Sequence, residues 1–121
     1  MQDPNVVFIL TDQLRASALG CYGNNHINTP TIDNLADEGL QFEQAFTPHP
    51  ICTPARGSVQ TGRLKYEHRA THNSIPLDTH PERPMIARTF RDEGYRTGYI
   101  GKWHLDGQTG HGVRLKNSQG D

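Results

Sequence analysis

The pattern of apolar and polar residues predicts three strands, each followed by polar or turn-forming residues. Residues 5–11, NVVFILT, are a continuous β-branched and apolar run between Pro4 and Asp12. Such a run is typical of a strand buried on both faces of a parallel sheet. Residues 40–46 and 95–100 predict two further extended segments, although the alternation in the first of these is imperfect.

Three further segments have apolar residues at helical spacing. Helices are predicted over residues 29–39, 54–61 and 84–93, with glycine caps at Gly39, Gly62 and Gly94. Thr29 is the expected N-cap of the first helix, with Pro30 at its first position. The order favours an α/β fold that contains part of a mostly parallel sheet flanked by helices. Three strands are too few to complete such a sheet, so we expect the chain to belong to a larger domain.

Two segments carry no clear period and are predicted loops. Residues 13–28 contain glycines and asparagines and at most one short helical turn. Residues 64–84 are polar and rich in histidine and proline, and long loops of this kind inside a compact domain are usually functional. Residues 106–121 have neither period nor apolar content, which predicts a disordered tail.

Composition narrows the classes of function. The hydrophobic fraction is 33% and the mean hydropathy is -0.73, which is lean for a domain that folds alone. The net charge of -1 and the absence of a basic stripe argue against nucleic acid as a partner. The N-terminal residues include no basic region and no apolar run longer than a strand, so we expect no signal peptide, no membrane span and a cytoplasmic location.

Reactive side chains gather at three places. Asp12 and Gln13 follow the first predicted strand, and Lys102 and His104 follow the last, at ends where α/β sheets place ligands. Between them, Cys52 precedes a predicted helix with Arg56 one turn further on, where unpaired N–H groups and a guanidinium favour an anion. Together these groups would combine metal-binding oxygens, a nucleophile beside cations and an acid–base histidine. Such a set fits the cleavage of an anionic ester.

Several motifs together resemble the first part of type I sulfatases, in the alkaline phosphatase superfamily. CTPAR at residues 52–56 matches the C-x-P-x-R signature, and TGR at residues 61–63 continues it. NVVFILTDQ resembles the metal-binding first strand, while NTPTIDNLADEGLQFEQAF and YRTGYIGKWHL match later family segments in order. The resemblance implies that residues 1–105 are the N-terminal part of a sulfatase catalytic domain, and that the chain alone is inactive.

The resemblance also implies a role for each catalytic candidate. Cys52 would be oxidised to formylglycine by a formylglycine-generating enzyme; one hydroxyl of the hydrated aldehyde then attacks sulfur, and loss of a proton from the other eliminates sulfate. Arg56 would hold this group and the charge near it, and Lys102 would bridge the diol and a sulfate oxygen. His104 would take the diol proton, a task suited to an imidazole near neutral pH. The substrate would be a sulfated small molecule or glycan.

By the same resemblance, Asp12, Gln13 and the modified Cys52 would ligate a divalent cation. Hard oxygen ligands favour Ca²⁺, with Mg²⁺ or Mn²⁺ as alternatives. Gln13 departs from the usual pair of aspartates, so one negative charge is missing. This leaves open a phosphonate monoester or phosphodiester hydrolase on the same framework, or a truncated non-catalytic fragment.

The other histidines and Cys21 carry less information. His68 lies where the family often has a histidine after TGR, and it is the remaining candidate for a substrate contact. The remaining loop histidines have no pair with the spacing of a zinc site: His26, His49, His72, His80 and His111. Cys21 is predicted to be a packing thiol, and the two cysteines are expected to stay reduced.

Overall fold

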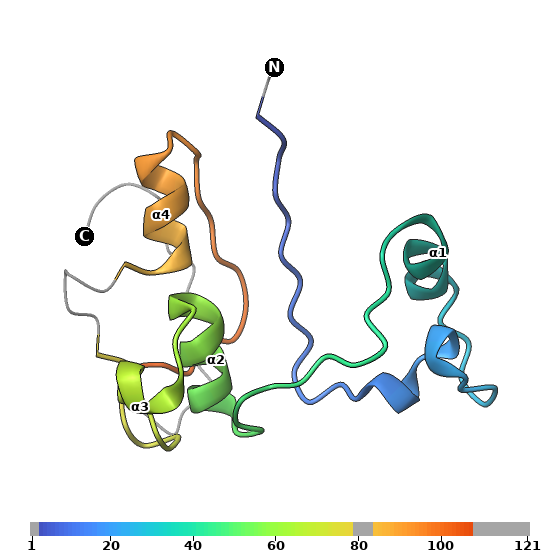
Figure 1. Ribbon diagram of the computed structural model, residues 1–121, viewed down its shortest axis with the longest axis horizontal. Helices are drawn as coiled ribbons and strands as arrows, with labels where there is room; N and C mark the ends of the chain where they lie inside the picture. The colour runs from blue at the N-terminus through green and yellow to red at the C-terminus, as the bar shows by residue number, and fades with distance from the viewer. Residues whose placement is uncertain (1–2, 79–83, 108–121) are drawn as a thin grey trace. The chain divides into compact units, whose positions relative to one another are not determined.

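The computed structural model describes residues 3–78 and 84–107, and they divide into two compact units. The first unit is Met1–Ala45 and the second is Phe46–Asp121. Figure 1 shows the helices of each unit, joined by long irregular segments. The predicted tail over residues 106–121 lies outside the described residues except for Asp106 and Gly107.

The helices of the first unit follow local rules of chain geometry. Two 3₁₀ helices, η1 (Ala16–Ala18) and η2 (Gly20–Tyr22), occupy the predicted loop, and the second ends at Gly23 with a φ of 91°. Helix α1 (Pro30–Glu38) begins with its proline and is followed by Gly39, which confirms the predicted bounds. The Thr29 hydroxyl makes no N-cap hydrogen bond; it accepts one from the Gly20 N–H at 2.8 Å and donates one to Asp33 at 2.9 Å. The threonine thus ties η2 to α1.

The second unit contains three helices. Helix α2 (Cys52–Thr61) begins before the predicted start and ends, as predicted, at Gly62, whose φ of 65° is left-handed. Helix α4 (Ile86–Asp92) is shorter than predicted at its start. Helix α3 (Lys65–His68) lies in a segment predicted to be loop, and the Glu67 carboxylate accepts the Leu64 N–H at 3.0 Å. A single helical turn is too short to show an apolar period, which is why the sequence does not reveal it.

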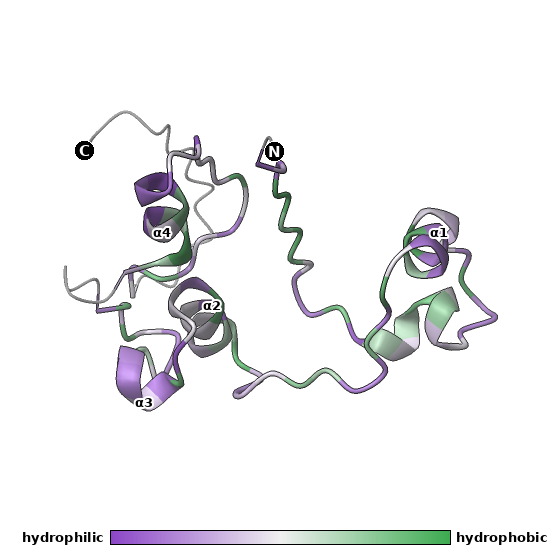
Figure 2. Cartoon of the chain, turned by 45° about the horizontal axis from the view of Figure 1, so that its top comes forward, coloured by the Kyte–Doolittle hydropathy of each residue, from purple (hydrophilic) through white to green (hydrophobic). Residues whose placement is uncertain are grey.

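The strand predictions are not met within the described residues. No strand forms over residues 5–11, 40–46 or 95–100. Isolated bridge residues occur at Tyr99, in the last of these segments, and at Lys102, just after it. A strand needs a neighbouring strand to pair its N–H and C=O groups, whereas a helix pairs them internally. Figure 2 shows the first of these segments as a hydrophobic run, and its Val7 and Ile9 side chains are 80% and 78% exposed.

The second unit has a small apolar core. Ala70, Leu77 and Leu105 are buried, and Met85 and Trp103 pack against them. The Leu77 N–H donates to the Leu105 carbonyl at 2.9 Å, so the loop after α3 is held against the segment that carries Lys102 and His104. This core is what keeps that segment close to α2. In the part of the chain that the structure describes, no helix is long and apolar enough to cross a membrane.

Candidate active site

The first turn of α2 presents Cys52 at the edge of the second unit. Ile51 precedes the helix in an extended conformation, and its carbonyl accepts the Ala55 N–H at 2.9 Å to close the first turn. Pro54 fits this turn because the first N–H groups of a helix have no partner inside it. Cys52 is half-buried and both cysteines are free, as predicted.

Lys102 reaches Cys52 from a segment that is distant in sequence. Its ammonium donates to the Cys52 sulfur at 3.6 Å. The Lys102 carbonyl accepts hydrogen bonds from the Arg56 guanidinium at 2.7 Å and from the Tyr99 hydroxyl. The Tyr99 ring in turn meets Trp103 edge-on at 5.2 Å. Lys102 is therefore held by its backbone while its charge points at the sulfur.

Arg56 is the link between the two segments. It is only 7% exposed, and its hydrogen bond spans 46 residues of sequence to bind α2 to the Lys102 backbone. A guanidinium offers five donors in a rigid fork, so it can hold this carbonyl and still contribute charge near Cys52. The structure thus places the Lys102 ammonium at Cys52, whereas Arg56, which the sequence predicted beside Cys52, binds the Lys102 backbone.

His104 lies next to the first turn of α2 through its backbone. Its φ is 51°, its side chain is 9% exposed, and its carbonyl accepts the Thr53 hydroxyl at 2.7 Å. A left-handed conformation at a residue other than glycine is uncommon and concentrates at functional sites. Thr53 and Tyr99 were not among the predicted site residues, because neither a period nor a charge pattern distinguishes them.

His68 lies inside the second unit, against α2. It is 1% exposed; its Nδ1 accepts the Ala70 N–H at 3.2 Å, and its Nε2 lies 3.2 Å from the Ser58 hydroxyl oxygen. Because Nδ1 accepts, the neutral ring carries its proton on Nε2 and donates it to Ser58. Burial lowers the pKa of His68 below its ordinary value, with smaller opposing effects from hydrogen bonds and Glu67. The substrate contact of His68 stays a prediction, while this geometry gives the ring a packing role.

The lowered pKa of His68 predicts that the folded protein loses stability in mild acid. The unfolded chain binds the proton at the ordinary pKa of 6.5, and the folded protein only at lower pH. The contribution is therefore fully present above pH 6.5 and is lost as the pH falls through the folded pKa. Urea unfolding from pH 7.5 to pH 5 should show this loss, and it should shrink in His68→Gln, which cannot titrate. An equal loss in both proteins would contradict the assignment.

The predicted metal ligands are divided between the units. Asp12 and Gln13 lie in the first unit and Cys52 in the second. Gln13 has a left-handed φ of 56°, the same unusual conformation as His104. Asp12 and Gln13 offer hard oxygen donors, which suit Ca²⁺ or Mg²⁺ but are only part of a coordination shell. Across residues 3–78 and 84–107, no three His, Cys, Asp or Glu side chains cluster as a metal site.

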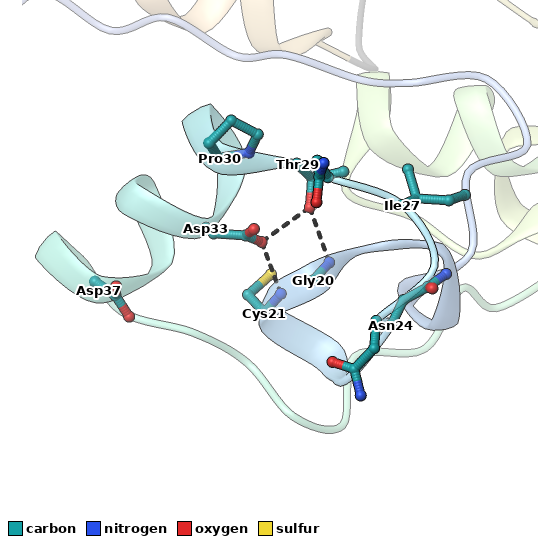
Figure 3. A pocket seen from close by; sticks show the side chains of 10 residues that line it. Gly20, Cys21, Asn24, Ile27, Thr29, Pro30, Asp33 and Asp37 are labelled. Atoms are coloured by element: carbon teal, nitrogen blue, oxygen red, sulfur yellow. Dashed lines mark hydrogen bonds between the residues drawn. The ribbon is translucent and has the colours of Figure 1, made fainter.

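The first unit also contains an open polar cavity of about 620 Å³ between η2 and α1. Figure 3 shows Asp33 directed at Thr29 and at the backbone of Cys21, whose N–H it accepts at 2.7 Å. Partial burial and then the charge of Asp33 raise the pKa of the Cys21 thiol above its ordinary value of 9.0. The thiol is therefore protonated at neutral pH, in keeping with its predicted packing role.

Comparison with protein families identifies related chains. The family model described as "Sulfatase" matches residues 4–115. The chain is 41% identical over 107 residues to "Uncharacterized sulfatase YidJ" of Escherichia coli K12, covering 88% of this chain and 21% of that protein. It is 44% identical over 104 residues to "Ulvan-active sulfatase" of Formosa agariphila, covering 86% of this chain and 20% of that protein. The chain thus spans about a fifth of the length of these curated relatives.

A solved structure shares the course of the backbone. It is a protein in complex with its substrate D-glucosamine-2-N,6-O-disulfate, and it aligns with a TM-score of 0.81 at 33% sequence identity. The alignment covers 86% of this chain and 21% of that one. The backbone of this chain therefore resembles part of a ligand-bound protein of solved structure.

Proposed function

This chain belongs to the sulfatase family, and from that premise we propose that it forms part of a hydrolase for sulfate esters, with a nucleophile derived from Cys52. The observation that carries the proposal is the 3.6 Å contact between the Lys102 ammonium and the Cys52 sulfur. The contact lies at the first turn of α2, where the helix dipole adds positive potential. An anionic group attached at position 52 would therefore meet a cation and a helix N-terminus together.

The nucleophile in this proposal is a formylglycine made from Cys52 by a formylglycine-generating enzyme. When hydrated, this group would supply two hydroxyls. One attacks sulfur and expels the alcohol of the ester, and the other loses its proton, so that sulfate is eliminated and the aldehyde is restored. Lys102 orients both the hydroxyl and a sulfate oxygen through its ammonium. Arg56 keeps the Lys102 backbone in place, and the His104 imidazole accepts the proton that drives release.

A divalent cation completes the proposed site. Asp12 and Gln13 would hold it, together with the modified side chain at position 52. Ca²⁺ fits these oxygen donors, with Mg²⁺ and Mn²⁺ as alternatives, and when bound it would polarise the sulfate. The left-handed backbone at Gln13 supports a positioned ligand there.

The chain needs more of the domain than it contains to be active. The apolar side chains of the segment 5–11 and of Ile100 are exposed. Further strands and helices of a mostly parallel sheet would bury them. The TM-score of 0.81 with a much longer protein supports this arrangement. We therefore expect the 121-residue chain by itself to bind metal weakly and to hydrolyse no aryl sulfate at a normal rate.

The proposed substrate class is a sulfated small molecule or glycan. One curated relative is described as ulvan-active, and the solved neighbour holds a disulfated glucosamine. Both names support a sulfated sugar as the first substrate to try.

Maturation is the direct test of the proposal. When the protein is produced with a formylglycine-generating enzyme, we expect the peptide that contains Cys52 to carry an aldehyde in place of the thiol. Mass spectrometry after alkylation reads this change, and the peptide that contains Cys21 is the internal control because its thiol should remain. Complete alkylation of Cys52 in such a preparation would remove the proposed nucleophile.

A second candidate function rests on Gln13. A neutral amide in place of an aspartate lowers the negative charge of the ligands around the cation. A site with that charge balance would favour phosphorus over sulfur as the atom attacked. Rates on matched aryl sulfate and aryl phosphonate monoester substrates, measured on a protein with the full domain, separate the two. The third alternative, a truncated non-catalytic fragment, is tested by extending the reading frame past Asp121: an intact gene should continue into further strands and metal ligands.

A further inference from the structure

We propose that Thr53 and Asn73 are positioning residues: Asn73 caps the helix that carries Cys52, and Thr53 fastens that helix to the segment that carries Lys102 and His104. The inference rests on the proposed function only for its effect on catalysis. The contacts themselves are features of the second unit and can be tested without activity.

Helix α2 lacks the usual side-chain cap at its start. Residues that cap helices carry an oxygen that accepts the N–H of the second or third helical residue. Ile51 stands at that position and has no such oxygen, and Pro54, the third residue, has no N–H. The N–H of Thr53, the second residue, is instead accepted at 3.0 Å by the Asn73 side chain, 20 residues further along. Asn73 therefore does from the following loop what an N-cap residue does locally.

The Thr53 side chain makes the second half of the connection. It is 0% exposed, and its hydroxyl donates to the His104 carbonyl at 2.7 Å across 51 residues of sequence. The bond holds the peptide group of a residue whose left-handed backbone is otherwise costly. Lys102 lies two residues before His104. The Thr53 bond to the His104 carbonyl and the Arg56 bond to the Lys102 carbonyl therefore hold the backbone of the segment whose Lys102 ammonium contacts Cys52.

Asn73 also shows a structural role for the loop after α3, whose sequence has no apolar period. The loop after α3 carries Asn73 to the start of α2 and Leu77 to the core, where its N–H binds the Leu105 carbonyl. Three segments thus meet at Thr53: α2, this loop and the residues that follow Tyr99. A shift of any one of them would change the distance between Cys52 and Lys102.

Hydrogen exchange and thiol alkylation test the contacts in the intact protein. In Asn73→Leu we expect the Thr53 amide to exchange about 10-fold faster, as for one lost hydrogen bond, whereas Asn73→Asp keeps an acceptor and should stay near the wild-type rate. With Cys52 left unconverted, Thr53→Val should change its rate of alkylation by iodoacetamide about threefold or more, relative to Cys21, because the Lys102 ammonium would no longer be held at the sulfur. Unchanged exchange in Asn73→Leu, or unchanged alkylation in Thr53→Val, would overturn the inference.

A matched variant separates positioning from a general loss of stability. The Thr61 hydroxyl donates to the Gly57 carbonyl at 2.7 Å, the same bond length in the same helix, and the one other bond described for it, from the Arg63 N–H at 3.3 Å, is local too. In a protein with the full domain and measurable sulfatase activity, Thr53→Val should lower kcat about 10- to 100-fold with little change in KM. Thr53→Ser should restore the rate, and Thr61→Val should leave it near wild type.

The positioning role of Thr53 and Asn73 and the proposed function can each be overturned without the other. A kcat of Thr53→Val equal to that of Thr61→Val, or no rescue by Thr53→Ser, would overturn the catalytic role of Thr53. If the full-domain protein hydrolyses no sulfate ester, the proposed function fails, while exchange and alkylation still decide whether Asn73 and Thr53 hold α2 as inferred.

Discussion

Replacing Cys52 by alanine is expected to abolish sulfate ester hydrolysis in a protein that carries this chain within its full domain. The substitution removes the sulfur next to the Lys102 ammonium, and with it the precursor of the proposed nucleophile. Loss of the nucleophile from a catalytic unit lowers kcat by on the order of 10⁴ to 10⁶. Aryl sulfate turnover measures the loss, and unfolding by urea should show little change because Cys52 is only half-buried.

Two further variants give this prediction its controls. Cys21→Ala removes the other thiol, which lies in the first unit, and should retain activity. Cys52→Ser offers a hydroxyl that cannot form an aldehyde by the same modification, so we expect it to take up sulfate once and keep it as an ester visible by mass. Activity of Cys52→Ala near the wild-type rate would contradict a nucleophile at this position. Multiple turnovers by Cys52→Ser would contradict the need for two hydroxyls.

Replacing Gly57 by alanine is expected to destabilise the protein, although the same change inside a helix normally stabilises it by up to about 1 kcal/mol. A Cβ at Gly57 would lie 2.7 Å from Cε1 of His68 and 3.0 Å from its Nδ1. The ring cannot move aside cheaply, because it is buried and bonded to Ser58 and Ala70. Overpacking of this kind costs about 1–3 kcal/mol, which outweighs the gain in helix propensity.

A double-mutant cycle tests that cause directly. In a His68→Ala background the space beside Gly57 opens, so the alanine should there stabilise α2 instead of destabilising it. The measurement is the free energy of unfolding of the four proteins in urea. The same destabilisation by Gly57→Ala in both backgrounds would mean that the His68 ring is not the obstacle.

The helices show how much the sequence determines locally. Pro30 and Gly39 bound α1, and Gly62 ends α2, as the sequence predicts. These signals work because each helix pairs its backbone groups within four residues, so starts and stops depend on nearby side chains. The same holds for the motif CTPAR. Its spacing places Cys52 and Arg56 one turn apart on a helix by helix geometry alone.

The strand segments show the opposite case. Residues 5–11 have the composition of a buried strand, yet their apolar side chains are exposed and no strand forms there. Strand hydrogen bonds run to another segment, so composition alone cannot supply the partner. The α/β prediction is thus supported by the likeness to a sulfatase-family structure and not by strands in the described residues.

The sequence by itself therefore determined the family and predicted α1, α2 and α4, but not the single turn of α3, and it suggested which residue types carry the chemistry. Only the tertiary structure decided which of them meet: the Lys102 ammonium reaches Cys52 across 50 residues, and His68 turns inward to Gly57 and Ser58. It also introduced Thr53 and Asn73, whose polar side chains have no distinguishing pattern. The physical reason is that a periodic pattern records only which face of an element is buried, whereas contacts between distant segments depend on how the whole chain packs.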